Sequence, residues 1–419
     1  MIRETASQKR IVLWNAAGSA VYAFSSFLML LIVVRACGEV EGGIFSMGYA
    51  IAQLMLTIGV FESTTYFATD AGNRFTHAQY LAFKFVTCAL MIIASIFYVM
   101  SFQFDAHKAS VAYALCAYRL FEAFSQYWYG AFQKAERLDL GGFSSVWRSI
   151  ISIVLFAGVL LPTGDVTLAV VVATISEVVW IIGYDIPRLR KIVHIGKPDF
   201  SPRPLGQLFW ACLPMFISSF LAAYLNNICK YAIDSAGTDE MQTIFNILFM
   251  PAFVINLFLI FFMRPSLTTL AKLWLERNAR PFMGILAKLL GLAALITLGV
   301  ELACALIGIP ILEWFYGVDL EGQTGALLIV MIGGGFLSAS NVFYNALVVI
   351  RNQHSVLVGY VVAIVLASVI ATPLVAGYAI MGACTAYAIS CALLFILFAI
   401  TFALCAAHQS RKWGKSEKA

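Results

Sequence analysis

Ionisable side chains inside long apolar runs are the residues of this sequence best placed to do chemistry, because burying a charge among apolar groups is costly. Arg119 and Glu122 lie three residues apart in one such run, and Gln126 and Gln133 continue the same helical face. An arginine there could hold an anionic group through its planar guanidinium. The alternative is that Arg119 and Glu122 neutralise each other and only lock helices together.

Two further charged residues lie in other apolar runs. Glu177 is near the middle of its run and has no basic residue within one helical turn, so we expect a largely protonated carboxyl. That carboxyl could couple transport to a proton or cation, or it could be a neutral group hydrogen-bonded to a neighbour. Arg148 lies near the end of its run, where we expect its long side chain to reach the polar interface.

Patterns for catalysis, metal binding or cofactor binding are missing from the sequence. None of the nine cysteines forms a CxxC pair, the five histidines form no paired motif, and no P-loop, dinucleotide fingerprint or HExxH occurs. We therefore predict no catalytic residue, no metal and no cofactor, and we expect no nucleic-acid partner. A membrane-embedded glycan polymerase or acyltransferase would need a catalytic histidine or aspartate in a sizeable loop, which this sequence does not offer.

The elements that carry these residues are predicted to cross a membrane. Hydrophobic residues make up 61% of the chain and charged residues 12%, against about 45–50% and about 25% in soluble domains. A spanning helix needs about 20 apolar residues. We therefore predict an all-α polytopic membrane protein whose twelve transmembrane helices lie near 11–35, 43–67, 79–102, 110–133, 142–161, 166–186, 206–231, 241–263, 283–308, 324–349, 355–375 and 379–407.

The basic residues predict how these helices are oriented. With twelve spans, nearly all of the 27 lysines and arginines fall on the side that holds both termini, and the positive-inside rule makes that side cytoplasmic. Arg35 and Lys230 are exceptions, because each ends the first helix of its half on the outer side. We interpret them either as guides for an anionic substrate or as partners of nearby acidic residues.

A polar segment with several prolines separates the first six predicted helices from the last six. The resulting domains are an N-terminal lobe at 1–186, a cytoplasmic linker at 187–205, a C-terminal lobe at 206–407 and a basic cytoplasmic tail at 408–419. Pro214 and Pro251 interrupt helices of the second lobe, so they could be hinges or static kinks. The triplet Gly333–Gly335 predicts close helix packing.

Four stretches of the chain resemble one known family. They are NAAGSAVYAFSSFLMLLIVVRACGEVEGGIFSMGYAIAQLMLTIGVFE at Asn15–Glu62, TYFATD at Thr65–Asp70, YRLFEAFSQYWYGAFQKAERLDLGGFSSVWRS at Tyr118–Ser149 and NNICKYAID at Asn226–Asp234. These strings resemble the bacterial polysaccharide biosynthesis exporters. That family includes flippases for O-antigen, capsule and teichoic-acid repeat units, and it belongs to the multidrug/oligosaccharidyl-lipid/polysaccharide exporter superfamily.

The resemblance implies two six-helix bundles arranged as a V around a central cleft. It also implies a flippase that moves an undecaprenyl-diphosphate-linked oligosaccharide, or a teichoic-acid precursor, from the inner to the outer leaflet by alternating access. The candidate substrate contacts that match the family pattern are Arg35, Arg119, Glu122, Arg148 and Lys230, and Glu177 is the candidate ion-coupling residue.

The partners implied by the resemblance are the lipid-linked glycan, the bilayer of the bacterial cytoplasmic membrane, and the glycan polymerase and glycosyltransferases of the same pathway. A second hypothesis shares the superfamily fold. It is a proton- or sodium-coupled exporter of small amphiphilic cations, which the acidic residues Glu122 and Glu177 would suit.

Overall fold

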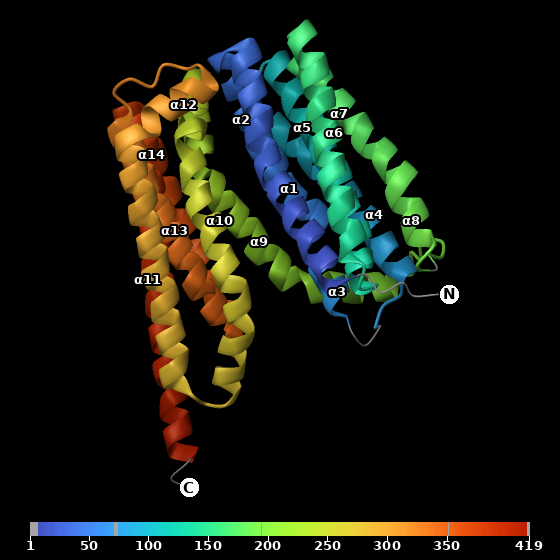
Figure 1. Cartoon of the computed structure of the whole chain (residues 1–419), viewed down its shortest axis with the longest axis vertical. Coiled ribbons are helices and arrows are strands. Elements are labelled where there is room, and N and C mark those ends of the chain that lie inside the picture. The colour runs from blue at the N-terminus through green and yellow to red at the C-terminus, as the bar shows by residue number, and fades with distance from the viewer. Residues whose placement is uncertain (1–6, 71–73, 194, 351, 417–419) are drawn as a thin grey trace. The chain divides into compact units, whose positions relative to one another are not determined.

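The computed structural model of the chain describes residues 7–70, 74–193, 195–350 and 352–416, and helices form the regular structure of that part. The chain divides into two compact units, residues 1–223 and residues 224–419. Figure 1 colours the first unit from blue to green and the second from green to red. The all-α fold class predicted from the sequence is confirmed.

The first unit is a bundle of long helices with short helical segments at their ends. Its elements are α1 (Gln8–Cys37), α2 (Glu39–Val60), α3 (Ser63–Thr69), α4 (His77–Met100), α5 (Ala106–Lys134), α6 (Leu138–Thr163), α7 (Val166–Trp180), the π-helical turn η1 (Ile181–Asp185), α8 (Ile186–Arg190) and the first part of α9 (Pro202–Ala236). Helix α1 packs along α6, α2 packs along α5, and α4 contacts both α2 and α5. The polar face of α5 is consequently buried inside the unit.

The second unit is built around α13, which packs against α10, α11 and α14. Its elements are the last part of α9, α10 (Asp239–Leu275), α11 (Ala279–Ala303), the π-helical turn η2 (Cys304–Gly308), α12 (Ile309–Tyr316), α13 (Thr324–Val349) and α14 (Gln353–Ser416). A Cβ on Gly333 would lie 2.6 Å from the ring of Tyr387, and one on Gly335 would lie 2.5 Å from Thr297 Cγ2. The predicted close packing at this glycine triplet is confirmed.

Ten helices among the described residues are long and apolar enough to cross a bilayer. One of them, residues 355–406 in α14, is 52 residues long, or roughly 78 Å, against a hydrocarbon core of about 30 Å. It is broken at Ala379, whose backbone is not helical (φ 51°, ψ −130°). Helix α5 is also long enough to span, but its polar face lowers its hydropathy. The described chain therefore has about ten to twelve spans, against twelve predicted.

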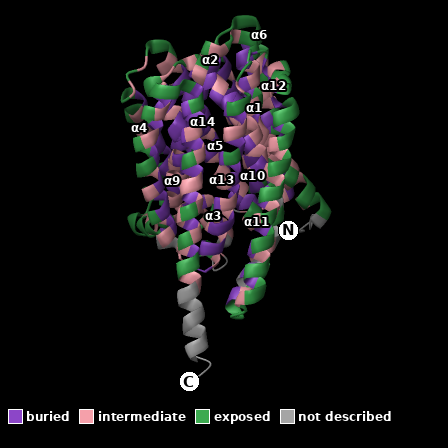
Figure 2. Cartoon of the chain, turned by 90° about the vertical axis from the view of Figure 1, so that its left-hand side faces the viewer, coloured by how far each residue is buried: buried purple, intermediate pink, exposed green. Residues whose placement is uncertain are grey.

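Figure 2 shows in green the exposed residues along the helices, and many of these are large and apolar. Phe97 of α4 is 69% exposed and Leu298 of α11 is 65% exposed. Apolar surface on this scale is stable when lipid is the solvent. The chain is a multi-pass membrane protein.

The division between the two units falls inside α9, at residues 223 and 224, and not within the predicted linker at 187–205. Leu189, Ile195 and Leu205 of that segment pack against the aromatic core of the first unit. Apolar side chains are interspersed among the prolines and charged residues of this segment, and they are buried in the core. The composition of the segment alone did not indicate this packing. The predicted tail at 408–419 begins within α14, and its side chains lie outside those described.

Both proline hinge candidates lie within continuous helices, Pro214 in α9 and Pro251 in α10. A hinge role for either proline stays a prediction. The observed irregularities lie elsewhere, and one is the end of α2, where Phe61 (φ 47°) and Glu62 (φ 51°) are both left-handed.

Two other irregularities are the π-helical turns η1 and η2, which are followed directly by helices with Pro187 and Pro310 in their first turn. A proline ring clashes with the carbonyl group four residues earlier. A wider π turn relieves that clash, and such turns are frequent at functional sites.

Candidate functional site

The side chains of Arg119 and Glu122 form an ion pair inside the first unit, on adjacent turns of α5. They are 4% and 3% exposed. The guanidinium also donates to the hydroxyl of Tyr49 and, at 2.9 Å, to Oε1 of Gln53, while the hydroxyl of Tyr22 donates to Glu122. A buried ion pair is tolerated when further hydrogen bonds satisfy it. Helices α1, α2 and α5 supply those bonds here, so the pair holds three helices together.

Arg148 of α6 faces Glu177 of α7, with Nε of the arginine 2.9 Å from Oε2 of the glutamate. The N–H does not point along this line, so the contact is an ion pair without a hydrogen bond. Both side chains are buried. Two expectations are corrected. Arg148 does not reach the interface, and Glu177 is not isolated, because its basic partner comes from a neighbouring helix.

Asp185, in η1, is a further buried carboxylate, and it acts electrostatically on Arg148. Oγ of Ser144 donates to Asp185 Oδ1 at 2.6 Å, and Nε1 of Trp180 donates to Ser144 Oγ at 3.0 Å. The π turn thus places a carboxylate beside the Arg148 ion pair. Sequence analysis did not single out Asp185.

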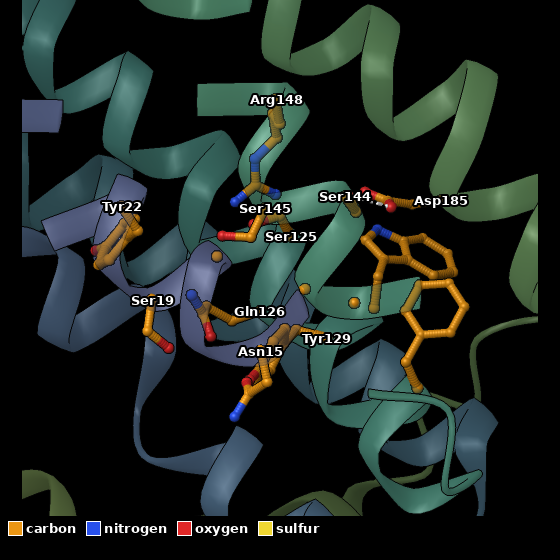
Figure 3. A pocket seen from close by; sticks show the side chains of 15 residues that line it. Asn15, Ser19, Tyr22, Ser125, Gln126, Tyr129, Ser144, Ser145, Arg148 and Asp185 are labelled. Carbon is orange, nitrogen blue, oxygen red and sulfur yellow. Dashed lines mark hydrogen bonds between the residues drawn. The ribbon is translucent and has the colours of Figure 1, made fainter. Parts of the chain in front are cut away.

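A polar cavity of about 150 Å³ lies beside these charges. Figure 3 shows its labelled side chains, with Arg148 reaching in from α6, Tyr22 and Ser19 from α1, and Gln126 from α5. Its polar lining consists of Asn15, Ser19, Tyr22, Ser125, Gln126, Tyr129, Ser144, Ser145, Arg148 and Asp185. The cavity has room for several water molecules. Hydroxyl and amide groups dominate it, and such groups can both donate and accept hydrogen bonds.

Two glycines bring α1 and α6 together at this cavity. A Cβ on Gly142 would overlap the backbone of Trp14, and one on Gly18 would lie 2.9 Å from the carbonyl oxygen of Gly142. Small residues let the backbones of membrane helices approach closely. Both glycines line the cavity, so a larger side chain at either one would change its shape.

Lys84 of α4 is a buried cation, 1% exposed, that the sequence analysis did not single out as a site residue. Its Nζ donates to the carbonyl oxygens of Gly59 and Val60 at 2.9 Å and 3.2 Å. These carbonyls end α2, where the helix dipole is negative. Just beyond them, Glu62 accepts a hydrogen bond of 2.5 Å from Ser219 of α9. Charges at this point join α2, α4 and α9.

Asp70, in the loop after α3, ends the TYFATD string. It accepts hydrogen bonds from the backbone N–H groups of Arg74 and Phe75 and from the hydroxyl of Tyr80. Burial alone would raise the pKa of Asp70, but these bonds and the nearby charge of Lys134 hold it below its ordinary value.

The contacts of the buried network just described include neither Arg35 nor Lys230. Arg35 is exposed in the last turn of α1, in the first unit. Lys230 lies near the end of α9, in the second unit, with Nζ 5.9 Å from the centre of the Phe249 ring. Five of the six predicted substrate and coupling residues lie in the first unit, and four of them, Arg119, Glu122, Arg148 and Glu177, form its two buried ion pairs.

Comparison with known proteins places the fold. No family model and no curated protein matches the sequence. Among solved structures, the lipid II flippase MurJ in an inward closed conformation matches with a TM-score of 0.68 and 11% identity, over 93% of this chain and 87% of that chain. An inward-facing multidrug resistance MATE family transporter of the MOP superfamily matches with a TM-score of 0.64 and 13% identity, over 95% and 99%.

The chain has the fold of the MOP superfamily transporters. A further MOP superfamily transporter, from Pyrococcus furiosus, matches with a TM-score of 0.62 and 14% identity, over 95% of each chain. These likenesses agree with the fold that the resemblance of the sequence strings implies. At such low identity they describe the MOP fold alone, and the neighbours include both a lipid flippase and multidrug exporters.

The sequence analysis did not identify the side chains that contact the predicted residues or line the cavity with them. One signal for them existed, because Asn15, Ser19 and Tyr22 recur at the spacing of one helical face. That stripe lines the cavity. No comparable signal marked Asp185 or the pairing of Arg148 with Glu177, since both depend on contacts between helices.

Proposed function

We propose that this protein is a flippase that moves a lipid-linked glycan, carried on a polyisoprenyl diphosphate such as undecaprenyl diphosphate, across the bacterial cytoplasmic membrane by alternating access. The observation that carries the proposal is the chemistry of the buried site in the first unit. It combines a cavity of hydroxyl and amide groups with the guanidinium of Arg148. Hydroxyl-rich and phosphate-bearing substrates are recognised by such groups.

The pairing of the buried carboxylates also favours a glycan over a cation. Glu122 is held by Arg119 and Tyr22, Glu177 by Arg148, and Asp185 by Ser144. A cationic substrate would need to displace one of these partners before it could pair with a carboxylate. A neutral glycan can instead hydrogen-bond to the hydroxyl and amide groups of the cavity, and a diphosphate can pair with Arg148 once a proton has neutralised Glu177.

A second candidate is a proton- or sodium-coupled exporter of small amphiphilic cations. It is favoured by the count of buried charges around the cavity, where Glu122, Glu177 and Asp185 face only Arg119 and Arg148. The matches to MATE family transporters support the same candidate. The two candidates differ in the charge of their substrate, which makes them separable by experiment.

Ion coupling is assigned to Glu177 in this proposal. A proton arriving at Glu177 would release Arg148 from its ion pair, and Arg148 lines the cavity. We expect the Glu177→Gln variant to fold and to lose the dependence of transport on a proton gradient. Transport by proteoliposomes with and without an imposed gradient measures this, and an unchanged gradient dependence would remove Glu177 from the coupling role.

Arg35 and Lys230 are proposed to guide the diphosphate at the outer side. Lys230→Gln should slow export at normal protein abundance, whereas Lys230→Arg should be better tolerated because it keeps the charge. The measurement is the amount of lipid-linked repeat unit left on the inner leaflet. The assignment would be contradicted if the double Arg35→Gln, Lys230→Gln variant, present at wild-type abundance, gave normal surface glycan.

Depletion of the protein in its native cell tests the function as a whole. If the protein is a flippase, its depletion should make lipid-linked glycan accumulate on the inner leaflet, because the glycosyltransferases continue to make it. The polymerase should then lack substrate. Both termini are expected in the cytoplasm. Normal glycan export together with a new sensitivity to cationic dyes would favour the exporter instead.

A further inference from the structure

An apolar groove of about 780 Å³ lies on the first unit, and Trp128 separates it from the polar cavity by lining both. Its walls come from α4 and α5, where Phe85, Ile92, Phe121 and Phe124 line it, and it is closed at one end by α8 and residues 195–198. Phe85 and Ile92 are 44% and 46% exposed. The groove therefore opens to the surface that faces lipid.

One end of the groove is cationic. Arg190 and Lys197 line it there, both are exposed, and neither has an acidic partner among the described residues. The buried ring of Trp128, which is only 4% exposed, forms part of the groove wall. A guanidinium and an ammonium group thus line this end of the groove without an acidic partner, and such a pair of cations can bind a phosphate.

The cationic end lies at the first turn of α4. There the backbone N–H of Asp199 donates to the carbonyl oxygen of Ala78 at 3.1 Å, and Gln79 donates to the Asp199 carboxylate at 3.1 Å. From this end the groove follows α4 from Leu81 to Ile92. That is about 16 Å at ~1.5 Å per residue, close to half of the ~30 Å hydrocarbon core.

We propose that this groove is a binding site for one anionic membrane phospholipid of the cytoplasmic leaflet. An acyl chain lies between α4 and α5, and the phosphate is bound by Arg190 and Lys197. The length of the groove favours a lipid of one leaflet over the much longer polyisoprenyl chain. Basic pockets on the cytoplasmic side of membrane helices recognise such headgroups. The site is independent of what the protein transports.

Native mass spectrometry of the purified full chain, titrated with phosphatidylglycerol or with zwitterionic phosphatidylethanolamine, tests the site. We expect one tightly retained phosphatidylglycerol and weaker retention of phosphatidylethanolamine. Each cation near the headgroup contributes about fivefold in affinity, so the double Arg190→Gln, Lys197→Gln variant should bind phosphatidylglycerol about 20–30-fold more weakly. Both positions are exposed, so these substitutions should leave folding intact.

Two matched controls separate this site from general lipid contact. Lys191→Gln removes an exposed charge next to Arg190 that does not line the groove, and it should leave binding unchanged. Ala89→Trp fills the groove and should abolish binding, whereas Ala294→Trp on the exposed face of α11 should not. Equal loss in Lys191→Gln and the double variant, or equal retention of the two lipids by the wild type, would overturn the proposal.

Discussion

The interiors of the two units are stabilised by different kinds of interaction. The buried charged residues among those described all lie in the first unit, and they are Lys84, Arg119, Glu122, Asp139, Arg148, Glu177 and Asp185. The buried polar residues described in the second unit are neutral, such as Gln242, Asn246 and Ser340. Its centre is instead the glycine contact surface of α13.

The first unit therefore contains interactions that cost free energy to bury, whereas the second unit contains close helix packing. Burying ions is expensive and contributes little net stability, so a buried ion network within membrane-spanning helices points to function. Close glycine packing has no such cost and gives van der Waals contact between helices. We infer that the first unit holds the chemically selective site of the protein.

The largest effect on stability is expected from a substitution that breaks the ion network of the first unit. Arg119→Leu leaves Glu122 buried without its cation, which should lower the free energy of unfolding by about 3–5 kcal/mol. The double Arg119→Leu, Glu122→Leu variant should recover most of that loss, since it leaves no unpaired charge. Unfolding of the purified protein in detergent, followed by circular dichroism, measures both variants.

The exchanged variant, Arg119→Glu with Glu122→Arg, sharpens the same comparison by asking what Arg119 does beyond pairing. If the pair only locks helices, the exchange should restore both stability and transport. If Arg119 also contacts substrate, the exchanged protein should fold and fail to transport. A double leucine variant as unstable as Arg119→Leu alone would show that the ion pair is not the cause.

A smaller effect is expected from packing in the second unit. Gly335→Ala places a Cβ against Thr297 and should destabilise the protein by about 1–3 kcal/mol. The matched control is Gly299→Ala in α11, where a Cβ would meet nothing within 4 Å. Because alanine favours helix over glycine by about 1 kcal/mol, that control should be neutral or stabilising. Equal effects at the two positions in the same unfolding assay would contradict the packing account.

The smallest effect concerns a charge outside the spans. The pKa of Asp70 is lowered by its hydrogen bonds, so its carboxylate contributes stability above the unfolded pKa of about 3.9. This contribution is lost as pH falls through the lower folded pKa. Asp70→Asn should therefore reduce the melting temperature at pH 7 and approach wild type near pH 3. A difference that does not vary with pH would mean that the charge of Asp70 is not what stabilises the loop.

The sequence predicted the fold class and the burial of Arg119 and Glu122 because both depend on local properties. Apolar runs of bilayer length give helices such as α2 and α13, and the position of Arg119 within its run indicated burial. Partners could not be predicted in the same way. Glu177 lacks a basic neighbour on its own helix and is paired by Arg148 from α6, and the linker residues Leu189 and Ile195 are buried by tertiary packing.

The backbone irregularities of the structure could not be predicted for a related reason. Prolines inside α9 and α10 are accommodated without ending the helix, whereas Pro187 and Pro310 follow π turns. The left-handed pair Phe61 and Glu62 involves no proline or glycine. It is held by tertiary contacts, including the ring of Phe61 stacked on Phe216 with centres 4.2 Å apart, which no local pattern reveals.

Transport by the purified protein in liposomes tests the proposed glycan flippase most directly. The two substrates are a fluorescent lipid-linked disaccharide diphosphate, read by its accessibility to an external reductant, and a lipophilic cationic dye. We predict movement of the lipid-linked glycan by the wild type, its loss in Arg148→Gln at matched protein amount, and no uptake of the dye by either. Proton-driven dye transport with no movement of the glycan lipid would contradict the flippase and establish the cation exporter.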